Sequence, residues 1–247
     1  MIVRVYGDTV SQWSARDEAS IKQCGQFAAY GAERDFLCFY EDENGNRLSV
    51  MDGAATLRAV GDTDEMLLFL TMDPTIHTVR TDRETAQRLS LMWGVSCDSE
   101  AVMEAPDHAV IDSHVVICND LRSIYDVLTE SFGSTALPPF DVWYADVHHR
   151  VRHGVCRVVG VYEKNECVAC AMTVSECADA AHIGAVATRP IARGKGYASA
   201  CVLTLTAMLQ QENKRVLLSP KNAYARTLYA KIGFRVIGEW GCVHKQA

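Results

Sequence analysis

The sequence of 247 residues predicts a mixed α/β protein built from two α/β halves. Short apolar runs with strand character alternate with segments whose apolar residues recur at helical spacing. Nearly half of the residues are hydrophobic, 49%, so the chain has enough apolar material for a sizeable core. A looser polar stretch around Pro106 divides the two halves, and we expect domains over residues 1–106 and 111–247.

In the first half, Asn44-Gly45 lies between two apolar runs and predicts a β-hairpin. Residues 62–73 begin with capping residues before an apolar stretch, and residues 84–93 have helical spacing, so both predict helices. Residues 75–81 predict a strand between these helices. Residues 97–113 have no clear periodicity and are expected to be irregular.

The second half has a more regular pattern and no internal repeat at the sequence level. Apolar, β-branched runs predict strands at 114–118, 155–162, 167–175, 182–188, 215–219 and 233–240. Helical spacing, with Pro139 and Asn222 at suitable N-terminal positions, predicts helices at 119–132, 139–153, 194–212 and 222–232.

Charge and hydropathy exclude several classes of protein. The formal net charge of -7 argues against a general nucleic-acid binder or a protein of anionic membrane surfaces, which would present a basic face. No apolar run reaches the roughly 18 residues that a membrane span requires. The first residues lack the apolar region of a signal peptide, so we expect a cytoplasmic protein.

The ten cysteines do not indicate a disulfide framework or a metal site. Most lie within apolar strand or helix contexts, where a free cysteine acts as a small hydrophobic residue. Cys167 and Cys170 form a C-x-x-C, but positions i and i+3 of a strand point to opposite faces. His149 and His153 share a helix face, but Arg150 stands where an H-E-x-x-H motif needs glutamate. We expect a solvated helix face there and no bound metal.

A glycine-rich basic loop precedes the predicted helix at 194–212. It reads Arg193-Gly194-Lys195-Gly196 and is followed at once by apolar helical residues. Glycines let backbone N–H groups approach a ligand, and a helix N-terminus adds unpaired donors and positive potential, which favours phosphate binding. The loop matches neither the Walker A motif nor the dinucleotide fingerprint, so the type of phosphate ligand stays open at this point.

Two motifs in the second half, in order and at the usual separation, give this chain a resemblance to a known family. Arg193, Gly196 and Ala198 match [QR]-x-x-G-x-[GA], and a later segment matches N-x-x-A-x-x-L-Y-x-x-x-G-F in full, at Asn222, Ala225, Leu228, Tyr229, Gly233 and Phe234. Over about residues 111–247 the chain therefore resembles the GNAT superfamily of N-acetyltransferases. The resemblance implies a mixed, mostly antiparallel central sheet flanked by helices. Residues 1–106 have no such loop, and we treat them as a candidate degenerate GNAT-like half.

The resemblance implies acetyl-CoA as cosubstrate and no metal. It places the coenzyme A pyrophosphate on the loop and the pantetheine arm on the backbone of the central strand, with an asparagine beside the arm. In this sequence the implied cofactor-binding residues are Val186, Ala187, Thr188, Arg193, Gly194, Lys195, Gly196, Tyr197, Ala198, Ser199 and Asn222.

The resemblance also suggests two catalytic residues. Tyr229 matches the usual general acid, and a phenol with a pKa of about 10 can protonate a departing thiolate. His182 lies eleven residues before Arg193, where histone-acetylating relatives carry a glutamate and arylalkylamine-acetylating relatives use histidine nearby; imidazole can accept a proton from an amine. A third subgroup uses a glutamate five residues before the motif asparagine, where this chain has Leu217.

The expected function is acetyl transfer to a primary amine of a small molecule or peptide. Early helices border the acceptor groove in this family, so Asp141, Tyr144 and His148 are candidate substrate contacts. Two alternatives stay open: a non-catalytic acyl-CoA-binding module, and a transferase for a longer acyl group. The sequence does not identify the amine or indicate an oligomeric state.

Overall fold

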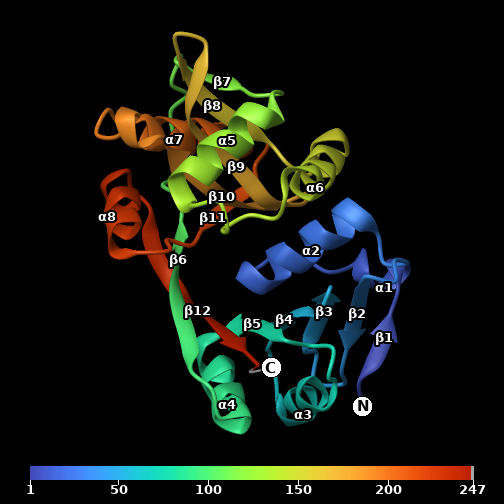
Figure 1. The fold of residues 1–247 in the computed structure, drawn as a ribbon. Coiled ribbons are helices and arrows are strands. Elements are labelled where there is room, and N and C mark those ends of the chain that lie inside the picture. The colour runs from blue at the N-terminus through green and yellow to red at the C-terminus, as the bar shows by residue number, and fades with distance from the viewer. Residues whose placement is uncertain (246–247) are drawn as a thin grey trace. The chain divides into compact units, whose positions relative to one another are not determined.

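The computed structural model describes residues 1–245, and its contacts divide the chain into two compact units (Figure 1). Unit 1 contains Met1–Val102 together with the segment from Ile237 onward, and unit 2 contains Met103–Val236. The segment from Ile237 therefore lies in unit 1, although we grouped it with the second half. Whether residues 1–106 and 111–247 form separate folding domains stays a prediction.

Unit 1 is an α/β unit with a mostly antiparallel sheet. Its elements are β1 (Val3–Val5), α1 (Gly7–Val10), α2 (Glu18–Tyr30), β2 (Leu37–Glu41), β3 (Arg47–Met51), β4 (Ala54–Arg58), α3 (Asp64–Met72), β5 (Thr78–Asp82), α4 (Arg83–Trp93) and β6 (Cys97–Glu104), whose last two residues belong to unit 2. Strands β1 to β4 pair antiparallel in sequence order, β5 runs parallel to β4, and β12 (Arg235–His244) pairs with β5. Helices α3 and α4 pack on the sheet through a buried leucine-rich cluster.

The strands of unit 2 have helices on both faces. Its elements are β7 (Val115–Ile117), α5 (Leu121–Phe132), α6 (Phe140–Arg152), β8 (Val158–Glu163), β9 (Glu166–Glu176), β10 (Ala180–Thr188), the short helix η1 (Pro190–Ala192), α7 (Tyr197–Gln210), β11 (Arg215–Leu218) and α8 (Ala223–Lys231). Strands β7 to β10 pair antiparallel in order, and β11 runs parallel to β10. One buried cluster joins the sheet to α7 and α8, and another joins it to α5 and α6.

The order of elements occurs twice in the chain. The series β-α-α-β-β-β-α-β-α-β runs from β1 to β6 and again from β7 to β12, with the parallel strand pair at the same place in each. We call these the first and second repeats. Each ends in a strand that pairs with the fifth strand of the other repeat: residues 240–244 of β12 pair with β5 within unit 1, and Met103 and Glu104 of β6 pair with β11 within unit 2. The first half thus has the same arrangement of elements as the second, which agrees with its interpretation as a candidate GNAT-like half, although no internal repeat is visible in the sequence.

Two local predictions were wrong. The stretch expected to be irregular contains β6, whose Met103 and Glu104 pair with β11. Cys167 and Cys170 were expected on opposite faces of a strand, yet both pack in the cluster under α5 and α6. A register shift between β8 and β9 inserts one extra residue on β9 at this point, so the usual alternation of faces is broken.

Candidate functional site

The glycine loop lies between η1 and α7, as the sequence predicted, but α7 begins only at Tyr197. Gly194 and Gly196 have φ values of +80° and +83°, a region that residues with side chains rarely adopt. Because this conformation is not helical, both glycines belong to the loop and α7 begins after them. Gly196 is the N-cap and makes no side-chain cap. The first intrahelical bond is from Ala200 N–H to Gly196 O, so the N–H groups of the preceding turn have no partner among residues 1–245. These donors and the helix dipole form an anion-binding arrangement.

Next to the loop, the central strand β10 extends beyond its neighbour β11. β10 pairs with β11 only from Ala180 to Ile183, because β11 ends at Leu218 while β10 continues to Thr188. Between Gly184 and Ala187 a bulge shifts the register of β10 against β9, and Ala185 has a positive φ of +48°. A bulge removes backbone groups from the ladder, so β10 can offer N–H and C=O groups to a ligand here.

A cavity of about 740 Å³ lies between the loop and the part of β10 that extends beyond β11. Its volume is within the usual range of small-molecule sites. Ten of the eleven predicted cofactor residues line it; Lys195 does not. Tyr229 also lines it, from α8. The motifs, far apart in sequence, are therefore brought together around one space.

Tyr229 lies on the cavity wall with 8% of its surface exposed. Burial raises the pKa of its hydroxyl to about 12, because the charged phenolate is disfavoured away from water. The phenol therefore keeps its proton at neutral pH and can act as a proton donor. Its ring contacts that of Phe234 at a centroid distance of 6.1 Å.

Asn222 has the predicted N-cap role, since its Oδ1 accepts a hydrogen bond of 2.9 Å from the N–H of Ala225. It begins α8 and so helps to place Tyr229 at the cavity. Because Asn222 also lines the cavity, its side-chain amide is positioned beside the space that a cofactor arm would occupy.

His182 lies on β10, opposite Ser175 on β9 and Leu217 on β11, and is not among the cavity-lining residues. Its neighbours Ala181 and Ile183 both belong to the core under α7 and α8, so the alternation of the strand places His182 on the opposite face. Its role as a proton acceptor stays a prediction.

The three candidate substrate residues lie on α6 and do not line this cavity. Tyr144 and His148 stack with centroids 5.1 Å apart and an angle of 11° between their rings, while Asp141 is exposed in the first turn. The structure therefore brings two of them together, apart from the predicted cofactor residues. Their contact with a substrate stays a prediction.

Sequence reasoning missed several cavity residues. Ser131 and Phe132 come from the end of α5, and Ser131 donates a hydrogen bond of 3.2 Å to the carbonyl of Thr188. Lys221 and Tyr224 flank the motif asparagine, and Tyr224 is 75% exposed. Their proximity to Asn222 was the one available signal; nothing in the sequence links α5 to the loop.

Solved structures with the same arrangement are known. A GCN5-related N-acetyltransferase from Kribbella flavida has a TM-score of 0.65 and 11% identity over 94% of this chain and 97% of that one. A tandem GNAT protein from the clavulanic acid biosynthesis pathway has a TM-score of 0.60 and 12% identity, covering 100% and 99%. This chain has the GNAT fold. A GNAT-family acetyltransferase from Colwellia psychrerythraea matches it over the full length of both chains, with 13% identity and a TM-score of 0.60.

The sequence supports the same assignment for the C-terminal part of this GNAT-fold chain. Residues 158–243 match the family model described as FR47-like protein, which is GNAT-related. This match contains the loop, α8 and Tyr229. No curated protein matches the sequence.

Two further observations concern residues 1–245. They contain no group of three or more His, Cys, Asp or Glu side chains arranged to hold a metal ion. In the same part of the chain, no helix combines the length and apolar character needed to cross a membrane.

Proposed function

We propose that the second repeat binds acetyl-CoA and transfers its acetyl group to a primary amine of a small molecule or peptide. One observation carries the proposal: unpaired N–H groups at the start of α7 open onto the same cavity as the buried phenol of Tyr229. An anion site and a proton donor at one cavity are what transfer from a phosphate-bearing thioester requires.

In this proposal the loop holds the pyrophosphate. The N–H groups of Gly194 to Ser199 and the N-terminus of α7 supply the donors, and Arg193 adds positive charge. The cofactor arm then lies along the bulged part of β10, where Val186 and Ala187 line the cavity and have no pairing partner on β11. Asn222 contacts the arm from α8.

Bound acetyl-CoA supplies an activated acetyl thioester. Tyr229 donates its proton to the departing sulfur, and its raised pKa keeps that proton in place at neutral pH. His182 takes up the proton of the attacking amine, directly or through water, because a neutral imidazole nitrogen can accept a proton. His182 itself lies outside the cavity lining.

The proposal is tested by incubating the full chain with acetyl-CoA and a broad panel of primary amines while free thiol is measured. Amine-dependent thiol release, with the acetylated amine identified by mass, supports it. Binding of acetyl-CoA with no release for any amine would identify a binding module instead. Release from longer acyl-CoA molecules only would identify a different acyl specificity.

A further inference from the structure

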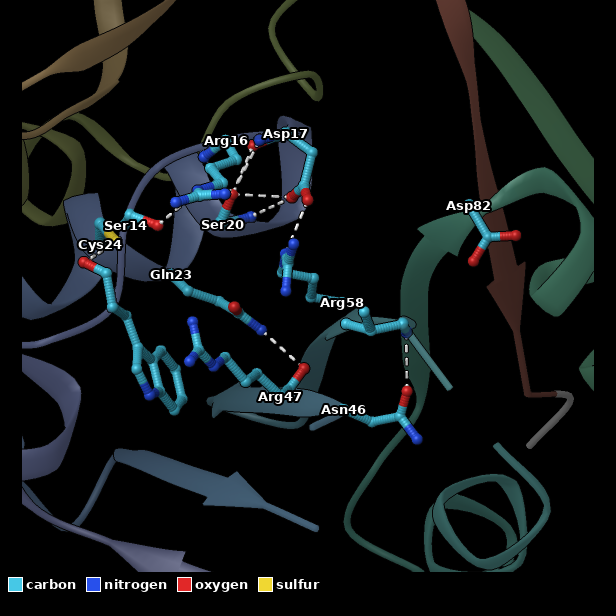
Figure 2. Close-up of polar contacts among 12 residues, drawn as sticks. Ser14, Arg16, Asp17, Ser20, Gln23, Cys24, Asn46, Arg47, Arg58 and Asp82 are labelled. Carbon is cyan, nitrogen blue, oxygen red and sulfur yellow. Dashed lines mark hydrogen bonds and ion pairs between the residues drawn. The ribbon is translucent and has the colours of Figure 1, made fainter. Parts of the chain in front are cut away.

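In both repeats, the hairpin between the second and third strands contacts the loop that precedes the third helix. In the first repeat this hairpin joins β2 to β3, and the loop lies between β4 and α3. Figure 2 shows Asn46 of the hairpin directed at that loop. In the second repeat the hairpin joins β8 to β9, and the loop is the glycine loop before α7.

In the first repeat the contact is buried and complete. Asn46 Oδ1 accepts hydrogen bonds from the N–H groups of Val60 at 2.8 Å and Gly61 at 3.1 Å. Its Nδ2 donates to Asp42 Oδ2 and to the carbonyl of Asp62. Asn46 is 0% exposed and Asp42 6%. The side-chain oxygen of Asn46 therefore already accepts from two N–H groups of this loop.

In the second repeat the contact is made by a longer, exposed side chain. Glu163 precedes a two-residue turn, Lys164-Asn165, and its Oε1 accepts a hydrogen bond of 2.7 Å from Lys195 Nζ and another from the hydroxyl of Tyr197. The side chains of Glu163 and Lys195 are 37% and 47% exposed. Unlike Asn46, Glu163 binds side chains of the loop and leaves its N–H groups open.

Lys195 is bound at the hairpin and not at the cavity that its loop lines. It lies between the two glycines of the loop, yet its residue does not line the cavity, whereas Arg193, Gly194 and Gly196 do. Its ammonium group is bound to Glu163 at the hairpin. In this structure the lysine of the loop therefore forms an ion pair with a carboxylate of the same chain.

We propose that Glu163 is a positioning residue of the cofactor site: it holds Lys195 at the hairpin in the free protein, and the phosphate of the cofactor takes Lys195 from it on binding. The proposal rests on the proposed function, because it needs a phosphate-bearing ligand at the loop. Glu163 would thus be the exchangeable counterpart of Asn46.

Because Glu163 and Lys195 are both exposed, little free energy is lost when the phosphate replaces Glu163 as the partner of Lys195. An ion pair between exposed side chains contributes little, because water and salt screen it, so a multiply charged phosphate can displace one carboxylate. The Lys195 hydrogen bond lowers the pKa of Glu163, so the carboxylate is charged at neutral pH and competes with the ligand throughout that range. A buried amide such as Asn46 has no comparable route to release.

The test measures the affinity of the full chain for CoA by calorimetry at low salt. Glu163→Gln removes the charge and keeps the size, so we expect CoA to bind about fivefold more tightly, the scale of one exposed ion pair. The matched control is Glu166→Gln, the same change at the other end of the same turn. Glu166 is exposed and pairs with Glu163 through the backbone only, so we expect less than a twofold change.

A double mutant separates positioning from general charge repulsion. If Glu163 acts by holding Lys195, Glu163→Gln should change affinity little in a Lys195→Met background. A full fivefold gain in that background would overturn the proposal, because Glu163 would then act on the ligand without Lys195. Unchanged or weaker binding by Glu163→Gln alone, in a wild type that binds CoA, would also overturn it and leave the proposed function intact. A wild type that does not bind CoA would overturn both.

Discussion

The rings of Tyr229 and Phe234 pack against each other at 6.1 Å, with an angle of 51° between their planes. This contact uses the ring of Tyr229 and not its hydroxyl, so packing and chemistry can be separated at this residue. Tyr229→Phe should leave the fold and the affinity for acetyl-CoA nearly unchanged.

We predict that Tyr229→Phe lowers kcat about 100-fold or more, the range for loss of a general acid. Steady-state thiol release and calorimetric binding of acetyl-CoA measure the two effects. Tyr6→Phe, which removes an exposed hydroxyl in unit 1, is the control and should retain wild-type turnover. Wild-type turnover in Tyr229→Phe would mean that solvent protonates the thiolate.

We predict that Gly196→Ala weakens acetyl-CoA binding more than tenfold, about 1.4 kcal/mol. The sequence-based reason was close approach to a phosphate; the structure shows open space around Gly196 and a φ of +83°, so the side chain acts by displacing the loop from this conformation. Gly154→Ala, at φ +70° and also in open space, is a matched control for strain. We expect the two variants to lose similar stability and only Gly196→Ala to lose affinity for acetyl-CoA. Equal affinity in both variants would show that the loop is not part of the binding site.

We predict that each chain binds one acetyl-CoA, although the fold occurs twice. In the loop of the first repeat, the N–H groups of Val60 and Gly61 are bonded to Asn46, and the acidic Asp64 and Glu65 lie in the first turn of α3, where they repel anions. Calorimetric titration should give one site per chain. Gly196→Ala should weaken that single site as predicted above, and a second site whose affinity Gly196→Ala leaves unchanged would show that the first repeat also binds.

We predict that His182→Gln removes the ascending limb from the pH profile of kcat/KM. Glutamine keeps hydrogen bonding and approximate size but cannot take up a proton. His153→Gln, at the end of α6, is the control and should retain the limb. If His182 is structural, its variant will lose thermal stability and keep the shape of the profile.

We predict that the ion pair between Arg157 and Glu212 stabilises the fold at neutral pH and that this stabilisation is lost in acid. Arg157 donates to both carboxylate oxygens of Glu212, at 2.7 and 2.5 Å, and this lowers the pKa of Glu212 from 4.5 to about 2. A carboxyl whose pKa is lower in the folded state stabilises it above pH 4.5, and the contribution is lost as the pH falls toward 2. Glu212→Gln should cost about 0.5–1 kcal/mol at pH 7, since Glu212 is half exposed.

Denaturant unfolding of wild type and Glu212→Gln at pH 7 and near pH 2 measures this difference. The gap between the two proteins should close at the acidic end. A gap that stays constant with pH would show that the carboxylate charge is not its source.

Residues whose role depends on local backbone conformation were predicted from the sequence. Gly194 and Gly196 adopt positive φ, Asn222 caps α8, and Tyr229 follows it at helical spacing. Each depends on a few neighbours along the chain, and such short-range patterns leave a signal in the sequence. The predicted cofactor residues and Tyr229 line one cavity, with the single exception of Lys195.

Only the tertiary structure decided which distant side chains meet. The repeated fold left no repeat in the sequence, because many apolar combinations satisfy the same buried positions. Several contacts join segments that are separated in the chain: Asn46 with Val60, Glu163 with Lys195, and β6 with β11. The sequence around one partner gives no indication of the other. Residues on α6 likewise have a helical pattern that sets their face but not their neighbours. Local geometry is encoded within a few residues, whereas long-range contacts depend on how the whole core packs.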